Sequence, residues 1–209
     1  MNDTPASRKP TPKHKFRVVY ADPPWPTGQH SKARGALRHY DLMSIREIIG
    51  MGNAIKHVMA ENSALFLWVT SNDLQAGLDV MAAWGYRYVT TFVWDKRPAM
   101  ALGVYFRGAH EILLFGVRGK SPFNFHAQRS IETFPRREHS AKPLGMFPLL
   151  EKLLPGPYLE LFARRRPPVR DDGSARDDWA IWGNEVDSDI SLLPFGYPVP
   201  SDFAEQETD

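Results

Sequence analysis

Short apolar runs alternate along the chain with segments whose apolar residues recur at helical spacing. Residues 44–59 and 72–84 place their apolar side chains mainly on one helical face, which predicts two helices. The first opens with a capping box formed by Ser44 and Glu47, while the second has a cap at Asn72 and ends before Gly85. We predict strands in the segments that are apolar, β-branched or aromatic: 16–21, 64–70, 86–94, 111–117, 157–163 and 179–183.

A third helix is expected from a cap at Ser140, with Pro143 in its first turn, to Leu154. Pro148 lies inside this stretch, so the helix must kink or begin later. The alternation of strands and helices predicts an α/β fold, with a doubly wound, mostly parallel sheet and helices on both faces. In such sheets, ligands bind at the carboxyl ends of the strands.

The ends of the chain are rich in proline, serine and acidic residues. We therefore expect flexible tails at residues 1–15 and 188–209 and one domain over residues 16–187. The 209 residues suit one domain, and the 43% apolar content is that of a globular protein. The amino terminus has cations with no apolar core behind them, and no apolar run approaches the length of a membrane span. We expect a cytoplasmic protein without a membrane anchor.

Composition also bears on metals and charge. The chain has no cysteine, so disulfides and Cys-ligated zinc are excluded, and we expect no metal. The formal charge is only +2, which does not by itself identify a nucleic-acid binder. Cations are nevertheless clustered in the loop 27–40, which has no acid, and in the four arginines of 163–170. These clusters are either solvated loops or contacts to phosphate.

The sequence "DPPW" at 22–25 follows the first predicted strand. Asp22 would offer two acceptor oxygens at the strand end, and Pro23 and Pro24 would stiffen the turn and keep their carbonyl acceptors. Trp25 would add a flat ring. A matching partner is flat and carries an amino group with two protons to donate, as adenine does. The alternative is a proline-rich turn that follows a strand, with Trp25 in the core.

Such a site would also promote a reaction. The lone pair of an aromatic amine is delocalised into the ring, so the amine is a poor nucleophile. Two acceptors would favour a more tetrahedral nitrogen and stabilise the positive charge that develops as the nitrogen attacks an electrophilic methyl group. Alignment of the nitrogen with the leaving sulfur would supply much of the rest of the rate enhancement.

Beyond this motif, the chain resembles the MT-A70 family of adenine N6 methyltransferases, which use S-adenosylmethionine (SAM). The similarity runs in one order over roughly residues 16 to 187. It includes "HYDLMSIREI" (39–48), "LFLWVT" (65–70), "WGYRYVTTFVWDK" (84–96), "HEILLFGVRG" (110–119), "REHSAKPLGMFPLLEKLLPG" (137–156), "YLELFARR" (158–165) and "WAIWGNE" (179–185). The resemblance implies a Rossmann-like methyltransferase fold in which the catalytic motif precedes the SAM motif.

The resemblance also implies roles for individual residues. The target amine and base would be held by Asp22, Pro23, Pro24 and Trp25. Lys142 would meet the SAM carboxylate, and Tyr40 would contribute to closure over substrate and cofactor. The cofactor would further contact Asp22 and residues in or after the last two strands: Glu160, Leu161, Phe162, Arg164, Arg165, Asn184 and Glu185. As alternatives, Lys142 is a solvated lysine and Asn184 a turn residue.

The chain departs from the family in three places. Only Asp3 is available for the acid upstream of the catalytic strand that contacts SAM in eukaryotic members. The sequence "RRPPVRDD" replaces a His–Asn pair often found after the position of Arg164, and Glu185 replaces a glutamine. These changes affect the contacts expected for the ribose of the cofactor.

The expected substrate is a nucleic acid, with DNA favoured and RNA possible, because no zinc-finger or RNA-binding motif is attached. Phosphate contacts are expected from cations near the pocket: Lys32, Arg34, Arg38, Lys96, Arg97 and Arg107. A homodimer or a heteromeric partner is possible. Two other functions stay open: a non-catalytic nucleic-acid-binding partner subunit, and methylation of a small molecule or protein amide.

Overall fold

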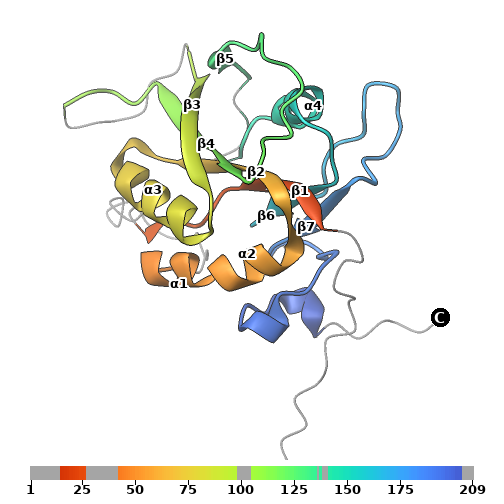
Figure 1. Ribbon diagram of the computed structural model, residues 1–209. Coiled ribbons are helices and arrows are strands. Elements are labelled where there is room, and N and C mark those ends of the chain that lie inside the picture. The colour runs from red at the N-terminus through yellow and green to blue at the C-terminus, as the bar shows by residue number, and fades with distance from the viewer. Residues whose placement is uncertain (1–14, 27–41, 98–104, 136, 138–140, 204–209) are drawn as a thin grey trace, which may run out of the picture.

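A seven-stranded sheet forms the centre of the structure (Figure 1). The computed structural model describes residues 15–26, 42–97, 105–135, 137 and 141–203. Within these residues the strand order is β5-β3-β4-β2-β1-β6-β7. The strands are β1 (Phe16–Ala21), β2 (Met59–Val69), β3 (Arg87–Asp95), β4 (His110–Arg118), β5 (Ile131–Thr133), β6 (Tyr158–Leu161) and β7 (Trp179–Trp182).

The sheet is mixed but mostly parallel, as predicted. Strand β1 pairs in parallel with β2 on one side and β6 on the other, and the pairs β6–β7 and β3–β5 are also parallel. Strand β4 runs antiparallel between β2 and β3. The chain order therefore reverses around β1, which is the position where doubly wound sheets bind ligands.

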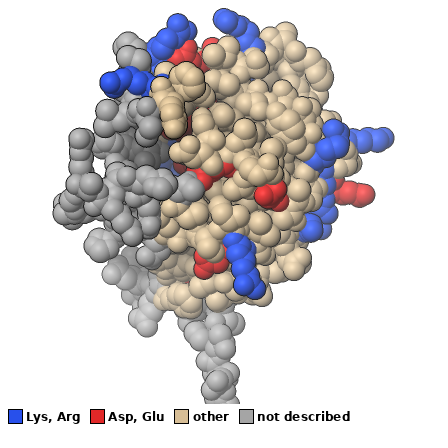
Figure 2. Space-filling model, turned by 90° about the vertical axis from the view of Figure 1, so that its left-hand side faces the viewer, with Lys and Arg blue, Asp and Glu red and all other residues tan. Residues whose placement is uncertain are grey.

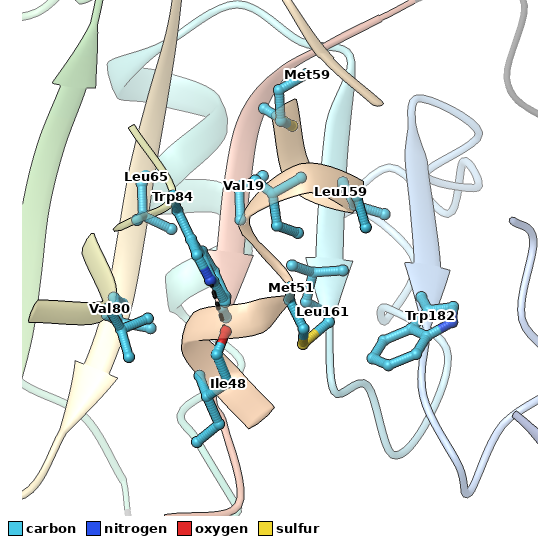
Figure 3. Packing of buried hydrophobic residues seen from close by; sticks show 14 of the residues in the cluster. Val19, Ile48, Met51, Met59, Leu65, Val80, Trp84, Leu159, Leu161 and Trp182 are labelled. Atoms are coloured by element: carbon cyan, nitrogen blue, oxygen red, sulfur yellow. Dashed lines mark hydrogen bonds between the residues drawn. The ribbon is translucent and has the colours of Figure 1, made fainter. Parts of the chain in front are cut away.

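Helices cover both faces of the sheet. On one face lie α1 (Ile45–Gly50), α2 (Gly52–Val58) and α3 (Leu74–Ala83), and on the other lies α4 (Met146–Leu153) (Figure 1). The α/β fold with helices on both faces is confirmed. A buried apolar cluster lies on each side, and Figure 3 shows the cluster on the α1–α3 side, where the Trp84 indole N–H donates to the Ile48 carbonyl at 2.8 Å.

Local capping signals were predicted correctly at two helix ends. The Ser44 amide donates to Glu47 at 2.7 Å and the Glu47 amide donates to Ser44 Oγ at 3.2 Å, which is the expected capping box. Gly85 follows α3 with a φ of 86°, a left-handed conformation that favours glycine. In contrast, Asn72 is not the cap, because residues Ser71–Asp73 form a 3₁₀ turn (η2) before α3 begins.

The helix predicted over 44–59 is two helices, which meet at Met51. Gly52 begins the second, and a Cβ atom there would lie 2.8 Å from the Ala83 carbonyl oxygen, so this helix approaches the end of α3 too closely for a side chain. Met59 has extended dihedral angles and starts β2, which is longer at its beginning than the predicted strand 64–70.

Helix α4 begins later than a cap at Ser140 would place it, and Ser140 lies outside the described residues. The start at Met146 puts Pro148 in the first turn. Backbone N–H groups in the first turn have no intrahelical acceptor, so the N–H that proline lacks costs no helical hydrogen bond. A later start was one of the two alternatives that the sequence left open.

Residues 188–203 differ from the expected tail because they pack onto the domain. Ile190, Leu192 and Val199 are buried in the cluster on the α1–α3 side. Two 3₁₀ turns, η3 (Leu193–Phe195) and η4 (Pro200–Asp202), lie in this segment beside α2 (Figure 1). The apolar residues among the prolines and acids are therefore core residues, which composition alone did not indicate.

Across the described parts of the chain, no helix has the length and apolar character that a membrane span requires.

Replacement of Leu192 tests the packing of this segment. Leu192→Ala should lower the free energy of unfolding by about 2–5 kcal/mol, because it removes a fully buried side chain and leaves a cavity. The matched control is Phe203→Ala, at a side chain that is 54% exposed, where a change within about 0.5 kcal/mol is expected. Equal denaturant midpoints and slopes for the two variants would contradict the packed segment.

Candidate active site

The ends of several strands bring charged residues to one edge of the sheet. Asp22 directly follows β1, and Lys96 directly follows β3. Because β4 is antiparallel, its beginning lies at the edge where β3 ends, and Glu111 pairs in register with Trp94. Lys142 is supplied by the segment before α4. Residues distant in sequence thus form a cluster at the carboxyl end of β1.

Alternating charges link these four residues. Lys142 Nζ lies 2.8 Å from Asp22 Oδ1 and 3.2 Å from Glu111 Oε2. The other oxygen of Glu111, Oε1, accepts from Lys96 Nζ. The side chains of Asp22, Lys142 and Glu111 are 31%, 17% and 20% exposed, respectively. The cluster contains two acids and two lysines, so it is electrically balanced at the border of solvent.

Burial and the neighbouring charges shift the pKa values in this cluster. Burial raises the pKa of Asp22, and the adjacent Lys142 ammonium offsets part of this shift. Burial by itself would lower the pKa of Lys142, but Asp22 and Glu111 outweigh it and the pKa is raised. For Glu111, the effect of burial is outweighed by Lys142 and Lys96, which lower the pKa. Lys142 therefore stays charged at neutral pH.

The proline turn after Asp22 is tied to its surroundings by backbone hydrogen bonds. The Pro23 carbonyl accepts from the Trp25 amide at 2.9 Å, and the Pro24 carbonyl accepts from the Met43 amide at 3.1 Å. Each carbonyl oxygen has two lone pairs, so each can still accept a second hydrogen bond. The expected carbonyl acceptors of the turn are present, and each of them already accepts one backbone hydrogen bond.

Trp25 faces the protein interior. Its side chain packs in the core cluster of the α1–α3 side, the residue is 6% exposed, and its indole N–H donates to the Trp68 carbonyl at 2.9 Å. The ring therefore does not present a free face for stacking on a base. Of the two interpretations that the sequence allowed, the core residue matches this geometry, because the turn folds the ring back under the sheet edge.

Glu160 in β6 carries a buried oxygen without a partner in the described structure. Its Oε2 makes no hydrogen bond, and burial together with the nearby Asp22 raises the pKa of Glu160 to about 8. On the neighbouring strand, the Trp182 indole N–H is also buried and unpaired among the described residues. Buried polar groups normally have partners, so an acceptor without a donor here is suited to a ligand that brings a cationic or N–H group.

The turns after β6 and β7 lie against each other. Phe162 has a φ of 62°, which is unusual for a residue other than glycine, and its ring meets Trp182 edge-on at 5.5 Å. A Cβ atom on Gly183 would lie 2.0 Å from the Ala163 carbonyl oxygen, so only glycine allows the two turns to approach this closely. Strain of this kind is often found at ligand sites.

The other residues predicted for the cofactor are also near these turns. Arg164 Nε lies 3.1 Å from Glu185 Oε1, so the residue that replaces the family glutamine forms an ion pair across the two turns. Arg165 and Asn184 are exposed, whereas Leu161 is buried in the core. Leu161 can therefore meet a ligand only through its backbone.

The residues predicted to contact substrate are only partly described. Lys32, Arg34, Arg38 and Tyr40 lie outside the described residues. Lys96 is bound to Glu111 and lies 4.5 Å from the centre of the Trp94 ring, so it belongs to the charge cluster rather than to an exposed rim. Arg97 is exposed but pairs with Asp95 at 2.6 Å.

Sequence reasoning missed Glu111. It is the first residue of the predicted strand 111–117, and in a mostly parallel sheet the first residues of a strand are expected at the edge opposite to Asp22. Only the antiparallel course of β4 brings Glu111 beside Lys142. No group of three or more metal-ligating side chains occurs within the described ranges.

Comparison with known proteins gives several relatives of similar identity. Type II methyltransferase M.MunI from Mycoplasma sp is 27% identical over 205 residues, which cover 88% of this chain and 83% of that protein. The human N(6)-adenosine-methyltransferase catalytic subunit METTL3 is 29% identical over 188 residues, covering 86% of this chain and 29% of METTL3. The MT-A70-like N(6)-adenosine-methyltransferase of Arabidopsis thaliana is 27% identical, with 82% and 24% covered.

The chain thus spans most of M.MunI but only about a quarter of the N(6)-adenosine methyltransferases. The sequence profile of MT-A70 matches residues 16–185, from the first residue of β1 to the turn after β7. That range contains the whole sheet and the charge cluster at its edge. The chain belongs to the MT-A70 family of methyltransferases, whose relatives named above include N(6)-adenosine methyltransferases.

Proposed function

We propose that this protein is a SAM-dependent adenine-N6 methyltransferase that acts on nucleic acid, with DNA favoured over RNA. The observation that carries the proposal is the position of Asp22, a partly buried carboxylate that follows the central strand and is joined to the carbonyl acceptors of a stiff proline turn. A lysine and a second acid lie next to it.

In this proposal, the acceptors of the turn hold the adenine amino group. One N–H donates to the Asp22 carboxylate and the other to the free lone pair of a proline carbonyl. SAM supplies an electrophilic methyl group on a positively charged sulfur. As the amine nitrogen becomes tetrahedral and positive, the nearby carboxylate stabilises the developing charge. Asp22 need not be a strong base, because the methylated ammonium product loses its proton readily.

The residues at the ends of β6 and β7 fit the cofactor. Glu160 offers a buried acceptor to a positively charged group, and Lys142 offers an ammonium to a carboxylate. The backbone of Leu161 and the side chains of Phe162, Arg164, Arg165, Asn184 and Glu185 surround the same turns. The ion pair of Arg164 with Glu185 takes the place that the resemblance assigns to ribose contacts, so recognition of the ribose requires that this pair rearranges or shares its groups.

Binding of nucleic acid requires cations beyond the charge cluster. The described surface in Figure 2 is mostly uncharged, with lysine and arginine residues scattered near its borders. Of the cations named from the sequence, Lys96 and Arg97 are already paired. We therefore assign the main phosphate contacts to Lys32, Arg34 and Arg38, and closure over substrate and cofactor to Tyr40. A homodimer or a second subunit would extend this surface.

The preference for DNA rests on the extent of similarity. The alignment with M.MunI spans 83% of that type II methyltransferase, whereas the alignment with METTL3 spans 29% of the latter. If the target lies in a duplex, the adenine must be turned out of the stack to reach Asp22.

The proposal is tested by transfer of a labelled methyl group from SAM to single-stranded DNA, duplex DNA and RNA in parallel, followed by mass analysis of nucleosides. N6-methyladenine in DNA supports it, label in RNA alone assigns the other substrate, and no label with intact SAM binding indicates a non-catalytic subunit.

Replacement of Asp22 should separate catalysis from cofactor binding. We expect Asp22→Asn to reduce methyl transfer by at least about 100-fold, because a charged acceptor is lost where positive charge develops, while SAM binding persists. Single-turnover rates and calorimetry provide the two measurements. Asp95→Asn is a matched control at a buried acid that pairs with Arg97, and it should keep most of the activity. Substantial activity in Asp22→Asn would show that the catalytic assignment is wrong.

Replacement of Trp25 should act mainly on stability. Trp25→Ala is expected to lower the free energy of unfolding by about 3–5 kcal/mol, as for other buried aromatic residues. Trp25→Phe keeps much of the volume and loses the hydrogen bond to Trp68, so a loss of about 1 kcal/mol is expected. Denaturant unfolding gives both values. Weaker adenine binding by the alanine variant at unchanged stability would instead indicate a stacking role.

Cofactor binding should depend on pH through Glu160. With its pKa raised to about 8, Glu160 is mostly neutral at pH 7, and a bound cation favours the ionised form. SAM affinity should therefore increase from pH 6 to pH 8, by up to about tenfold per pH unit, with release of a proton. Calorimetry in buffers of different ionisation enthalpy measures this proton. Glu160→Gln should abolish its release, and an unchanged proton release in that variant would exclude Glu160 as its source.

A further inference from the structure

Lys142 holds two carboxylates in this structure, and the proposed function gives it a third. We propose that Lys142 exchanges partners when the cofactor binds: its ammonium leaves Asp22 for the cofactor carboxylate, so Asp22 becomes free for the adenine amine only after the cofactor is in place. This inference rests on the proposed function and concerns the order of events at the same site.

The geometry of the ammonium group sets the competition. Lys142 Nζ is 2.8 Å from Asp22 Oδ1, 3.2 Å from Glu111 Oε2, and 5.5 Å from the centre of the Trp68 ring. A lysine ammonium has three N–H donors, and here they face two carboxylates and the aromatic ring. A third carboxylate beside the same ammonium would place three negative charges around one positive charge, so it binds more strongly when one of the first two leaves.

Asp22 is the partner that can leave. Glu111 is held by a second cation, Lys96, which is itself seated over the Trp94 ring, so Glu111 remains fixed and neutralised on β4. Within the described part of the chain, the carboxylate of Asp22 forms an ion pair with Lys142 alone, and the incoming ligand compensates its loss. SAM carries a sulfonium and an ammonium besides its carboxylate, so its positive groups approach the acid that loses Lys142.

The exchange assigns Glu111 a positioning role. Glu111 keeps the Lys142 ammonium at the sheet edge while its other partner changes, so the lysine does not swing into solvent. Before the cofactor binds, Oδ1 of Asp22 is engaged by Lys142, whose ammonium partly neutralises the carboxylate. Adenine bound in the absence of cofactor would therefore meet a weaker acceptor. The cluster makes cofactor-first binding the productive order.

A comparison of SAM with decarboxylated SAM measures the exchange. Both ligands carry the sulfonium and the amine. The dissociation constant of decarboxylated SAM divided by that of SAM therefore measures what the carboxylate contributes to binding. In the wild type, this ratio is reduced because Lys142 must leave Asp22. In Asp22→Asn the lysine is less tightly held, and the ratio should increase by about tenfold or more, the worth of one hydrogen bond to a charged group. Lys142→Met should bring the ratio close to one.

The control is again Asp95→Asn, which does not contact Lys142 and should leave the ratio unchanged. If Asp22→Asn gives the wild-type ratio while Lys142→Met lowers it, Lys142 binds the carboxylate without releasing Asp22, and the exchange is wrong. If neither ligand binds the wild-type protein, the proposed function itself fails. The two failures are therefore distinguishable.

A second measurement uses the wild-type protein and does not depend on the folding of a variant. Infrared difference spectra of protein with ¹³C-labelled aspartate carboxyl groups report changes in the environment of aspartates, Asp22 among them. SAM should shift an aspartate carboxylate band that decarboxylated SAM leaves in place. Identical difference spectra for the two ligands would overturn the proposal.

Discussion

The site depends on one constraint: a partly buried carboxylate, that of Asp22, lies at the end of β1. Burial raises the pKa of Asp22, and a nearby cation offsets part of this rise. Lys142 provides that cation, but as a buried ammonium it needs acids in turn, and Glu111 and Lys96 complete the alternation. The surrounding fold serves to bring these four side chains to one edge.

The antiparallel strand β4 is the part of the topology that makes this balance possible. In a wholly parallel sheet, the residues at the start of a strand lie at the edge opposite to the ligand site. Because β4 runs in reverse, Glu111 begins its strand beside Trp94 and next to the end of β3. The aromatic residues below add to the cluster: Trp68 lies under Lys142, accepts the indole N–H of Trp25 through its carbonyl, and donates its own to Tyr20.

Features set by neighbouring residues could be predicted from the sequence, whereas features set by distant ones could not. The capping box of Ser44 and the left-handed Gly85 follow from local chemistry, and the strand–helix alternation gave the fold class and the position of Asp22. The presence of Glu111 in the charge cluster could not be predicted without knowing the direction of β4. Trp25 was ambiguous because a tryptophan beside prolines suits either a core or a binding surface. Residues 188–203 look like a tail by composition, and the burial of Ile190, Leu192 and Val199 depends on packing against residues of helices that are distant in sequence.

That last segment is also connected to the proline turn after Asp22. The Tyr197 hydroxyl donates to the Glu47 carbonyl at 3.2 Å, Glu47 caps the helix that begins after Ser44, and the neighbouring Met43 amide donates to Pro24. The segment is thus linked to the Pro24 carbonyl beside Asp22 through the start of α1, by two hydrogen bonds and the capping box between them. The packing of residues 188–203 therefore helps to hold in place the turn that carries Asp22.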